Sequence, residues 1–398
     1  MSDFFRHGFF IGIKMKKNQN TFVFAGGGTG GHIYPGLAVA DELRALASKN
    51  NQEIKIIWLG NSSGMDRNLV EKSGSVDLFI GVPSGKLRRN FSFRNFTDLF
   101  KIFAGLVKSF FVLAKIRPSV LFSKGGFVSV PPCMAASFLR IPVFTHECDF
   151  TPGLATRLNS RFASKILVTY EETKSYLPAA KRSLAVVTGN PVRPVFYEPN
   201  PQNGKNFLFE NRSDYDETKP ILLVLGGSLG AHQINTLVAE NLDWLIERFN
   251  VVHQCGAKDA DSMPKDKPGY FLHPFIYKEM CDVISSADII LSRAGANSIW
   301  EASVLGKPMI LIPLCGSGTR GDQVDNAHFF EEKGAAIVLL GEYAESAYLK
   351  SALERMSDST FRMNSSLASK SLSEGKRPAQ KIAEIVWDAA FSKRGNEK

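Results

Sequence analysis

Two glycine-rich turns are the first features of this sequence whose residue types could do chemistry. One reads GGGTGGHIYPG from Gly26 and the other GGSLGAHQI from Gly226, and each follows an apolar run and precedes a helical pattern. Glycine lets the backbone turn sharply and approach a ligand, while the following helix directs free N–H groups and about half a positive charge at the same place. Phosphate suits such a site, so two turns favour one phosphorylated ligand or two.

The first turn also satisfies the dinucleotide fingerprint G-x-G-x-x-G, between Gly26 and Gly31. An NAD site needs, in addition, an acidic residue about 20 residues further on that holds the ribose. Here the second expected strand ends WLGNSSG, with no carboxylate before Asp66, and the chain has no GxxxxGK[ST] loop. NAD binding and P-loop chemistry are therefore disfavoured.

A third glycine pair, Gly125–Gly126, is either another anion contact or a tight strand–helix turn.

Two polar side chains near expected strand ends are candidates for proton transfer. His32 follows the first glycine turn, where the positive end of a helix lowers the pKa of an imidazole and keeps it neutral, as a general base requires. A packing or capping histidine is the alternative. Asp149 ends the segment HECD, which follows an apolar run. Ligands of parallel sheets collect beyond the carboxyl ends of the strands, so Asp149, His146 and Glu147 are expected near a cleft.

The second half of the chain offers candidates for binding a sugar nucleotide. Ala296, Asn297 and Ser298 begin an expected helix, and such small residues let a ligand lie close to the backbone. Glu301 follows one turn later, where a carboxylate accepts two hydrogen bonds from a ribose diol; a solvated glutamate is the alternative. Gln323, in DQVDN, is suited to sugar hydroxyls. That segment has no D-x-D pair, so we expect no metal ion.

Short apolar runs alternate with helical patterns along the whole chain, which predicts an α/β fold with parallel sheets covered on both faces. The halves repeat each other at an offset of 200 residues, so each is expected to open its own Rossmann-like domain. The matching residues are Gly26, Gly27, Gly30, His32 and Leu37 with Gly226, Gly227, Gly230, His232 and Leu237. Strands are expected at 21–25, 54–59, 76–80, 119–122, 142–145, 221–225, 289–291 and 309–312, and helices at 35–48, 128–139, 230–248, 296–305 and 322–333.

Composition and charge bound the class of protein. The chain has 398 residues, of which 44% are hydrophobic and 22% charged, as in soluble globular proteins of two or three domains. Its net charge of +9 allows an anionic partner. Residues 1–20 are expected to form a flexible extension rather than a signal peptide. Their apolar run is shorter than the roughly 7–15 residues of a signal-peptide core. No stretch reaches the roughly 18 uncharged apolar residues of a membrane span.

Residues 84–118 form a basic stretch with interleaved phenylalanines, holding eight Lys and Arg residues and one Asp. One interpretation is a core helix that follows a solvated basic loop. The other is a membrane-facing patch, with basic residues at anionic headgroups and Phe at the acyl boundary. No recognised motif supports nucleic-acid binding. The residues expected to face the membrane are Arg88, Arg89, Phe91, Phe93, Arg94, Lys101 and Lys108.

These motifs form an ordered set that resembles the MurG family, the undecaprenyldiphospho-muramoylpentapeptide β-N-acetylglucosaminyltransferases, over residues 21–390. The set comprises GGGTGGHIYPGLAVADEL, SKGGFVSVPP, HECD, GNPVR, GGSLGAHQIN, HPFI, SRAGANSIWEA, GKPMILIPL and DQVDNA. The resemblance implies a GT-B fold, in which two Rossmann-like domains face each other across a cleft. It divides the chain into an acceptor and membrane-side domain (21–195 with 377–398), a linker (196–220) and a UDP-sugar domain (221–376).

The resemblance also implies a reaction and its partners. N-acetylglucosamine passes with inversion from UDP-N-acetylglucosamine to the muramoyl 4-hydroxyl of a lipid-linked pentapeptide, which makes the disaccharide precursor of peptidoglycan. It implies no cofactor and a peripheral position on the cytoplasmic face of the cell membrane. The expected partners are the two substrates, an anionic membrane surface and other cell-wall synthesis proteins, but no nucleic acid.

Site roles follow from the resemblance position by position. Ser228 and Arg193 are expected at the UDP diphosphate, the Ile276 backbone at uracil and Glu301 at the ribose. Thr29, Gly30 and Gly31 are expected at the diphosphates, with His32 as base. The donor sugar is assigned to Ala296, Asn297, Ser298 and Gln323.

The chain departs from the family pattern where the usual H-E-Q-N reads HECD, so that Asp149 replaces an amide near the sugar. Its carboxylate either accepts a proton or binds sugar hydroxyls. Asp322 stands where many members have Gln or His. Two other functions stay open: another GT-B activity, such as a glycolipid transferase or a UDP-sugar 2-epimerase, and a non-catalytic sugar-nucleotide-binding scaffold at the membrane.

Overall fold

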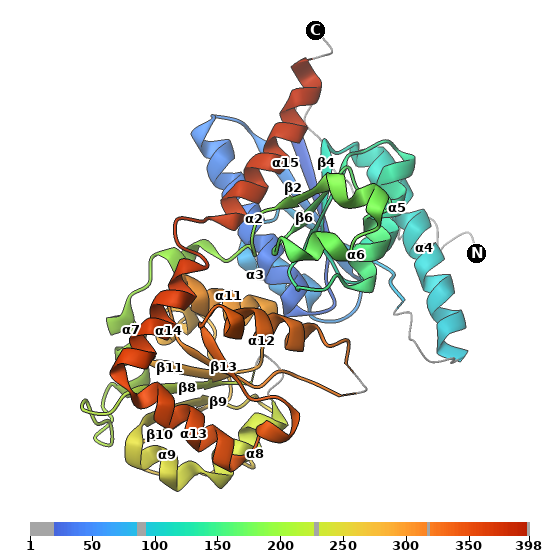
Figure 1. The fold of residues 1–398 in the computed structure, drawn as a ribbon. Helices are drawn as coiled ribbons and strands as arrows, with labels where there is room; N and C mark the ends of the chain where they lie inside the picture. The colour runs from blue at the N-terminus through green and yellow to red at the C-terminus, as the bar shows by residue number, and fades with distance from the viewer. Residues whose placement is uncertain (1–19, 86–92, 227–230, 317–318, 396–398) are drawn as a thin grey trace.

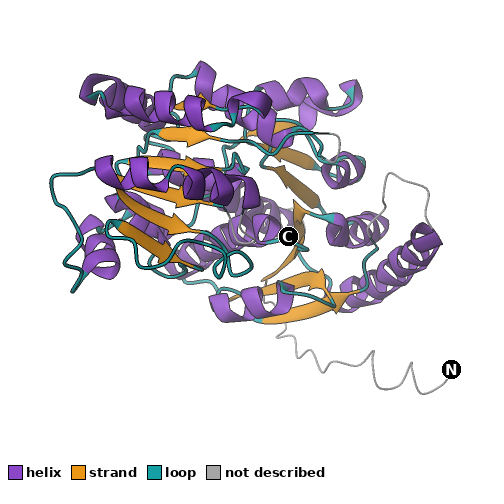
Figure 2. Cartoon of the chain, turned by 90° about the horizontal axis from the view of Figure 1, so that it is seen from below, coloured by secondary structure: helices purple, strands orange, loops and turns teal. Residues whose placement is uncertain are grey.

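The computed structural model describes residues 20–85, 93–226, 231–316 and 319–395, which form two α/β domains (Figure 1). In each domain a twisted sheet is covered by helices, and Figure 2 shows these layers of helix and strand from below. The expected fold class, two Rossmann-like domains with parallel sheets, is confirmed.

The two sheets share one strand order. The first is β3-β2-β1-β4-β5-β6-β7 and the second β10-β9-β8-β11-β12-β13, and all pairings are parallel. In nucleotide-binding folds of this order, ligands bind where the order reverses, here between β1 and β4 and between β8 and β11. The strands are β1 Asn20–Gly26, β2 Ile54–Asn61, β3 Leu78–Val82, β4 Val120–Gly125, β5 Val143–Glu147, β6 Lys165–Val168, β7 Ala185–Val187, β8 Ile221–Leu225, β9 Asn250–Gln254, β10 Tyr270–His273, β11 Ile289–Ser292, β12 Met309–Leu311 and β13 Ala336–Val338.

Every expected helix is present, with two shifts in extent. The first begins at Gly30 rather than residue 35 and so contains Pro35, and the range 230–248 is divided at Asn241. The helices are α2 Gly30–Lys49, α3 Asp66–Ser73, α4 Phe93–Ile116, α5 Val130–Phe138, α6 Leu154–Asn159, α7 Pro201–Phe209, α8 His232–Glu240, α9 Leu242–Arg248, α10 Met280–Ser286, α11 Ala296–Val304, α12 Asp322–Glu332, α13 Ser346–Ser357, α14 Ser359–Ser371 and α15 Pro378–Gly395.

Five strands were not among those expected: β6, β7, β9, β10 and β13. β7 and β13 have three residues each, too few to show a pattern. β9 reads NVVHQ, and its polar residues interrupt the apolar run although the whole strand is buried. Those polar groups are paired inside the domain; the Asn250 amide, for example, donates to the Asp216 and Lys219 carbonyls at 2.7 and 2.9 Å.

Residues 196–220, expected as a linker, contain helix α7 of the second domain. Leu208 and Phe209 are buried in that domain's core, where the Phe209 ring stacks on Tyr215 at 4.0 Å between centroids. The Pro, Asn and charged residues that signal a linker here form a helix cap, with the Asn200 side chain accepting from two backbone N–H groups, and an exposed loop. Amino-acid composition alone does not distinguish an interdomain linker from a capped helix followed by an exposed loop.

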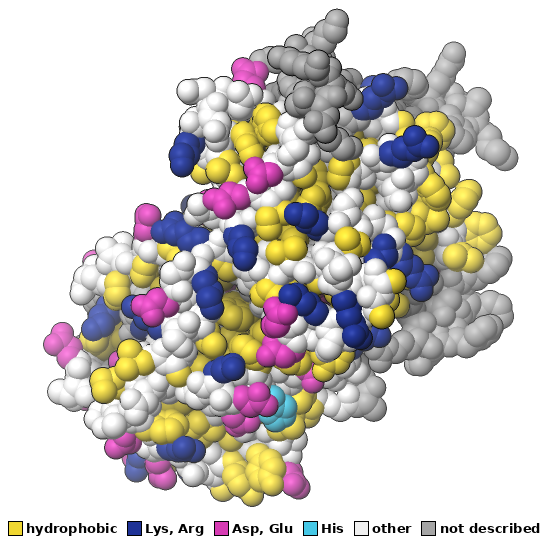
Figure 3. All heavy atoms as spheres, turned by 45° about the horizontal axis from the view of Figure 1, so that its top comes forward, with side chains coloured by type: hydrophobic (Ala, Val, Ile, Leu, Met, Phe, Trp, Pro, Cys, Tyr) yellow, Lys and Arg dark blue, Asp and Glu magenta, His cyan; other side chains and the backbone are white. Residues whose placement is uncertain are grey.

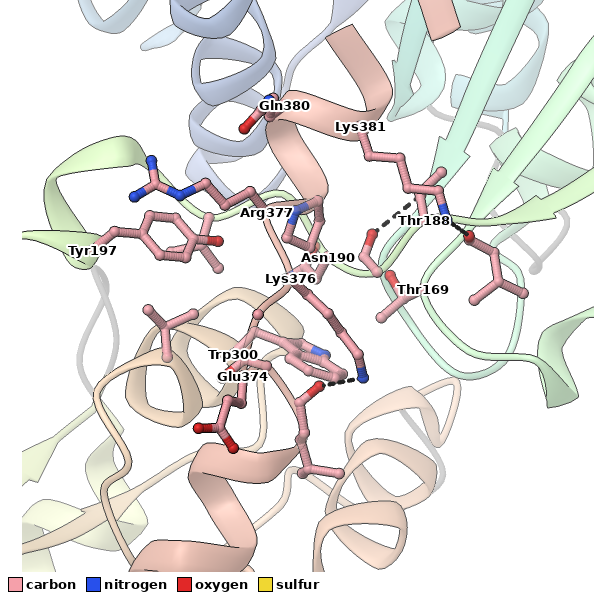
Figure 4. A pocket seen from close by; sticks show the side chains of 18 of the residues that line it. Thr169, Thr188, Asn190, Tyr197, Trp300, Glu374, Lys376, Arg377, Gln380 and Lys381 are labelled. Carbon is pink, nitrogen blue, oxygen red and sulfur yellow. Dashed lines mark hydrogen bonds between the residues drawn. The ribbon is translucent and has the colours of Figure 1, made fainter. Parts of the chain in front are cut away.

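Two crossings connect the domains, one near residues 188–197 and one near 372–378, and between them lies a cavity of about 920 Å³. Figure 4 shows it closely, with Tyr197 and Trp300 on its wall and Lys381 donating to the Val187 carbonyl at 2.8 Å. After the second crossing, α15 packs against α2 in the first domain (Figure 1). The first domain is thus completed by the end of the chain.

Helix α4 packs against the first domain by one side only. Leu113 and Ile116 are buried there. More than half of the surface of Leu99, Phe100 and Phe103 is exposed, so these side chains are not the core residues that one interpretation expected. Among the described residues, none of the helices is both long and apolar enough to cross a membrane.

His253, in the middle of β9, is a fully buried and fully paired imidazole. Asn235 uses its amide nitrogen on the Cys255 carbonyl, so its oxygen accepts from His253 Nε2 at 3.0 Å. The Tyr270 hydroxyl lies 2.8 Å from Nδ1. Burial lowers the pKa of His253 to about 4.

The pH dependence of stability follows from this lowered pKa. As pH falls from 6.5 towards 4, the unfolded chain takes up a proton at this histidine that the folded chain refuses, so the free energy of unfolding falls. At pH 5 we expect a loss of about 2 kcal/mol from His253. Urea unfolding of the wild type and of His253→Gln between pH 7 and 5 checks this: the variant should show a shallower slope. His328→Gln, on the exposed side of α12, is the matched control, and equal slopes for wild type and His253→Gln would contradict the assignment.

Candidate functional site

A cavity of about 560 Å³ lies between the two domains where the strand order of each sheet reverses. Twelve residues singled out from the sequence line it. They are Thr29, Gly30, Gly31, His32, Asp149, Arg193, Ile276, Ala296, Asn297, Ser298, Glu301 and Gln323. Ser228 lies outside the described residues, as do Arg88, Arg89 and Phe91; Phe93 and Arg94 lie in α4, but their side chains are not described. The structure thus gathers the described site candidates in one place, while their roles stay predictions.

The first glycine turn differs in one respect from a simple phosphate loop. The Asp66 carboxylate accepts from the Gly28 amide at 2.9 Å and from the Asn61 amide at 2.8 Å. It lies so close to Gly27 that a Cβ there would be 1.7 Å from Asp66 Oδ2. The Gly28 amide is therefore occupied by protein. The N–H groups of the first turn of α2, at Gly30 and Gly31, have no acceptor within the helix and lie at the cavity.

The glycine pair after β4 is required by close packing. Gly125 and Gly126 have φ of +96° and +76°. A Cβ at Gly126 would lie 2.4 Å from the Gly27 carbonyl oxygen. The pair therefore forms a tight turn, as one of its two interpretations predicted.

His32 lines the cavity. Its Nδ1 lies 3.0 Å from the Thr29 hydroxyl. Burial, with the nearby charge of Lys124, lowers the pKa of His32 to about 4, while Glu147 opposes this shift. The imidazole is thus neutral at pH 7, as the sequence predicted, but burial is the main cause rather than the helix end.

Asp149 connects the two domains. Its carboxylate accepts from Arg320 Nη2 at 2.6 Å and from the Asn326 amide at 3.2 Å, both from the second domain. Burial and the neighbouring Glu147 raise the pKa of Asp149 to about 6. Arg320 also pairs with Asp322 at 3.2 Å. Both carboxylate oxygens of Asp149 are therefore engaged by protein.

His146 and Glu147 have structural partners. His146 is buried with Nε2 at 3.0 Å from the Gly189 carbonyl. Glu147 accepts from the Asp149 and Gly153 amides at 3.1 and 2.9 Å, which fixes the turn after β5.

Glu301 and Arg193, which both line the cavity, form a partly buried ion pair of 3.4 Å. Burial raises the pKa of Glu301 and the charge of Arg193 opposes this. The Arg193 guanidinium lies over the rings of Tyr34 and Phe196, at 5.3 and 4.9 Å from their centroids. A ribose diol that binds Glu301 must therefore share this carboxylate with Arg193.

Three further expected contacts are partly engaged by protein. The Asn297 amide donates to the Gly31 carbonyl at 3.1 Å, across the cavity. Gln323 Oε1 accepts from the Leu314 amide at 2.9 Å. The Ile276 amide donates to Gln254 Oε1 at 2.8 Å.

Sequence reasoning missed several residues that line the cavity. Gln254 and Tyr277 lie after or near strand ends, but no motif marks them. Tyr34 and Phe275 lie in the motifs GGGTGGHIYPG and HPFI, which were used for other residues. Lys124 belongs to a motif that was noted for its glycines only. Among the described residues, no group of three or more His, Cys, Asp or Glu side chains is arranged to hold a metal ion.

Comparison with known proteins shows extensive similarity to glycosyltransferases. Residues 22–168 match the glycosyltransferase family 28 N-terminal domain, and residues 221–384 match its C-terminal domain. A UDP-N-acetylglucosamine--N-acetylmuramyl-(pentapeptide) pyrophosphoryl-undecaprenol N-acetylglucosamine transferase of Treponema denticola is 49% identical over 394 residues, covering 93% of this chain and 98% of that protein. A Bacillus cereus protein of the same name, numbered 2, is 37% identical and covers 92% and 99%.

Solved structures share the fold at lower identity. MurG of Acinetobacter baumannii has a TM-score of 0.68 and 21% identity, and covers 93% of this chain and 99% of that one. The UDP-GlcNAc 2-epimerase of Neisseria meningitidis has a TM-score of 0.63 and 16% identity, and covers 94% and 100%. These likenesses concern the fold alone.

The Glu301 carboxylate is the group to test on the nucleotide side. Glu301→Ala should raise the dissociation constant of UDP about 10- to 100-fold, since a hydrogen bond to a charged group is lost. Isothermal calorimetry with UDP measures this, with the exposed Glu332→Ala as control. If Glu301→Ala binds UDP as tightly as the wild type, Glu301 does not contact the nucleotide.

Proposed function

This chain belongs to the MurG family of N-acetylglucosaminyltransferases, and from that premise we propose that it transfers N-acetylglucosamine from UDP-N-acetylglucosamine to the muramoyl-pentapeptide carried on undecaprenyl diphosphate. The product is the lipid-linked disaccharide from which peptidoglycan is made. One observation carries the proposal beyond the similarity: a single cavity holds the neutral imidazole of His32 from one domain and the Glu301–Arg193 pair on the other side.

The geometry of His32 supports a direct displacement. In the proposed tautomer Nδ1–H donates to the Thr29 hydroxyl, and the lone pair of Nε2 takes the proton of the muramoyl 4-hydroxyl. As that oxygen bonds to C1 of the donor sugar, the bond from C1 to the UDP oxygen breaks, and its electron pair leaves on the diphosphate. Attack opposite the leaving group inverts the configuration at C1.

The donor is held by the second domain. The N-terminus of α11, with Ala296, Asn297 and Ser298, directs N–H groups into the cavity, where charge develops on the departing diphosphate. Arg193 supplies a cation beside this helix, and Glu301 positions the ribose. Ser228 is assigned to the same diphosphate, and Gln323 with Ile276 to the sugar and the base.

Two assays on the wild type separate this function from its alternatives. Radiolabelled UDP-N-acetylglucosamine with a lipid-diphosphate acceptor yields labelled lipid only for the transferase. Release of a 2-epimerised sugar without acceptor would indicate an epimerase instead. Binding of UDP with neither product would indicate a non-catalytic scaffold.

Loss of the His32 base should affect the rate and not donor binding. His32→Ala and His32→Gln should each lower kcat about 10²- to 10⁴-fold with UDP affinity unchanged. Because the pKa of His32 in the free protein is lowered to about 4, the base stays competent as pH falls, so the acid limb of the wild-type kcat/KM profile should lie near pH 4 rather than 6.5. Unchanged kcat in both variants would remove His32 from this role.

Helix α4 is the proposed membrane contact, with the enzyme peripheral on the cytoplasmic face of the cell membrane. Its exposed apolar side chains (Leu99, Phe100, Phe103, Phe110 and Phe111) share one side of the helix, and Lys101 and Lys108 border them. Figure 3 shows hydrophobic side chains gathered with Lys and Arg at the edge of the molecule where α4 lies. Such a surface enters the headgroup region, while the cations bind anionic lipid.

Removal of two of these apolar side chains should weaken vesicle binding. Leu99→Ser with Phe103→Ser should lower the fraction sedimenting with vesicles of 30% phosphatidylglycerol about fivefold or more, since each buried CH₂ contributes about 0.8 kcal/mol. The matched control is Met363→Ser with Leu367→Ser, on the equally exposed surface of α14. Equal sedimentation of both double variants would contradict a membrane contact through α4.

A further inference from the structure

Lys124 is a buried cation of the catalytic cavity that the mechanism above does not use. It lies near the end of β4, and only 3% of its surface is exposed. It lines the cavity together with His32 and Asp149. A charged side chain at this depth needs a reason, because burial of a charge is costly unless it is paired.

The only hydrogen-bond partner of the Lys124 ammonium among the described residues is a thiol. Its Nζ lies 2.8 Å from Cys148 Sγ, and that thiol donates to Asn190 Oδ1 at 2.6 Å. Burial raises the pKa of Cys148 to about 11, so the thiol is neutral. No carboxylate of the described residues lies within 4.0 Å of the ammonium. Among the described residues, no carboxylate therefore forms an ion pair with Lys124.

The other cations around the cavity are neutralised. Arg193 pairs with Glu301 at 3.4 Å, and Arg320 pairs with Asp149 and Asp322 at 2.6 and 3.2 Å. Unlike these two arginines, Lys124 has no paired carboxylate among the described residues. This contrast indicates that Lys124 binds an anionic group of a substrate.

The position of Lys124 indicates which of the two anionic substrates it contacts. β4 neighbours β1 at the point where the order of the first sheet reverses, and the first turn of α2 follows β1 there. An anion at this place lies near the first turn of α2 and the ammonium, whereas the donor's diphosphate is assigned to α11 of the second domain and to Arg193 in the crossing between the domains. Ammonium groups are compact charges that bind phosphate oxygens well.

We infer that Lys124 is the cationic contact for the diphosphate of the lipid-linked acceptor, an inference that rests on the proposed function. Lys124 should therefore not contribute to the affinity for an acceptor with a neutral linkage. It should not contribute to the affinity for the donor either.

A comparison of two acceptors tests this contact. One carries the diphosphate and the other, otherwise identical, has a neutral linker in its place. Lys124→Met should raise KM for the diphosphate acceptor about 10- to 100-fold and leave KM for the neutral acceptor within twofold of the wild type. If the neutral acceptor is turned over too slowly, its inhibition constant gives the same comparison. Lys124→Arg should recover part of the loss, and Lys165→Met, at the exposed start of β6, is the control.

Two further measurements on Lys124→Met separate a specific role from damage. Its affinity for UDP by calorimetry should equal that of the wild type, which shows a folded donor side. The acid limb of the kcat/KM profile should move to higher pH, because the charge of Lys124 contributes to the low pKa of His32 in the free protein. An equal KM increase with both acceptors would show a structural role, and a loss of UDP affinity would place Lys124 at the donor; either result overturns the inference. Absence of transfer by the wild type would instead refute the proposed function.

Discussion

A proline inside α2 leaves a backbone carbonyl for which the second domain supplies the hydrogen-bond donor. Pro35 has no N–H, so the carbonyl of Gly31, four residues earlier, lacks its helical donor. Asn297 of the second domain supplies that donor at 3.1 Å, and Asn190 donates in turn to the Ala296 carbonyl at 3.2 Å. These bonds bring the N-termini of α2 and α11 to one cavity, although the helices belong to different sheets. Two positive helix ends in one place suit a reaction between two diphosphate substrates.

Charge within the cleft is balanced across the domain boundary. The carboxylate at Asp149, where relatives of the family usually have an amide, would repel diphosphates if it were unpaired. Arg320 offsets it at 2.6 Å, and the same arginine reaches Asp322, the second departure from the family pattern. The two departures therefore belong to one interdomain cluster. This also explains how an added negative charge is compatible with anionic substrates.

The sequence predicts the parts of this protein that depend on local pattern. The glycine turns, the repeat at an offset of 200 residues and the strands β1 and β8 follow from residue type and spacing, and they locate both strand-order reversals. The short strands β7 and β13 do not, because pairing with neighbours decides them. The interdomain pairs of Asp149 and Arg193, and the thiol partner of Lys124, depend on side chains that meet only after folding. Helix α4 shows the same limit, because periodicity predicts its apolar residues but not which of them are exposed in the folded protein.

The return of α15 to the first domain has a consequence for biosynthesis. Ile382, Ala383 and Val386 of this helix fill a hydrophobic core otherwise built from α2 and the strands next to it. On the ribosome, the entire second domain must be translated before this helix emerges, which takes roughly 10 to 40 seconds at bacterial rates. During that interval the nascent first domain lacks the apolar side chains with which α15 completes its core.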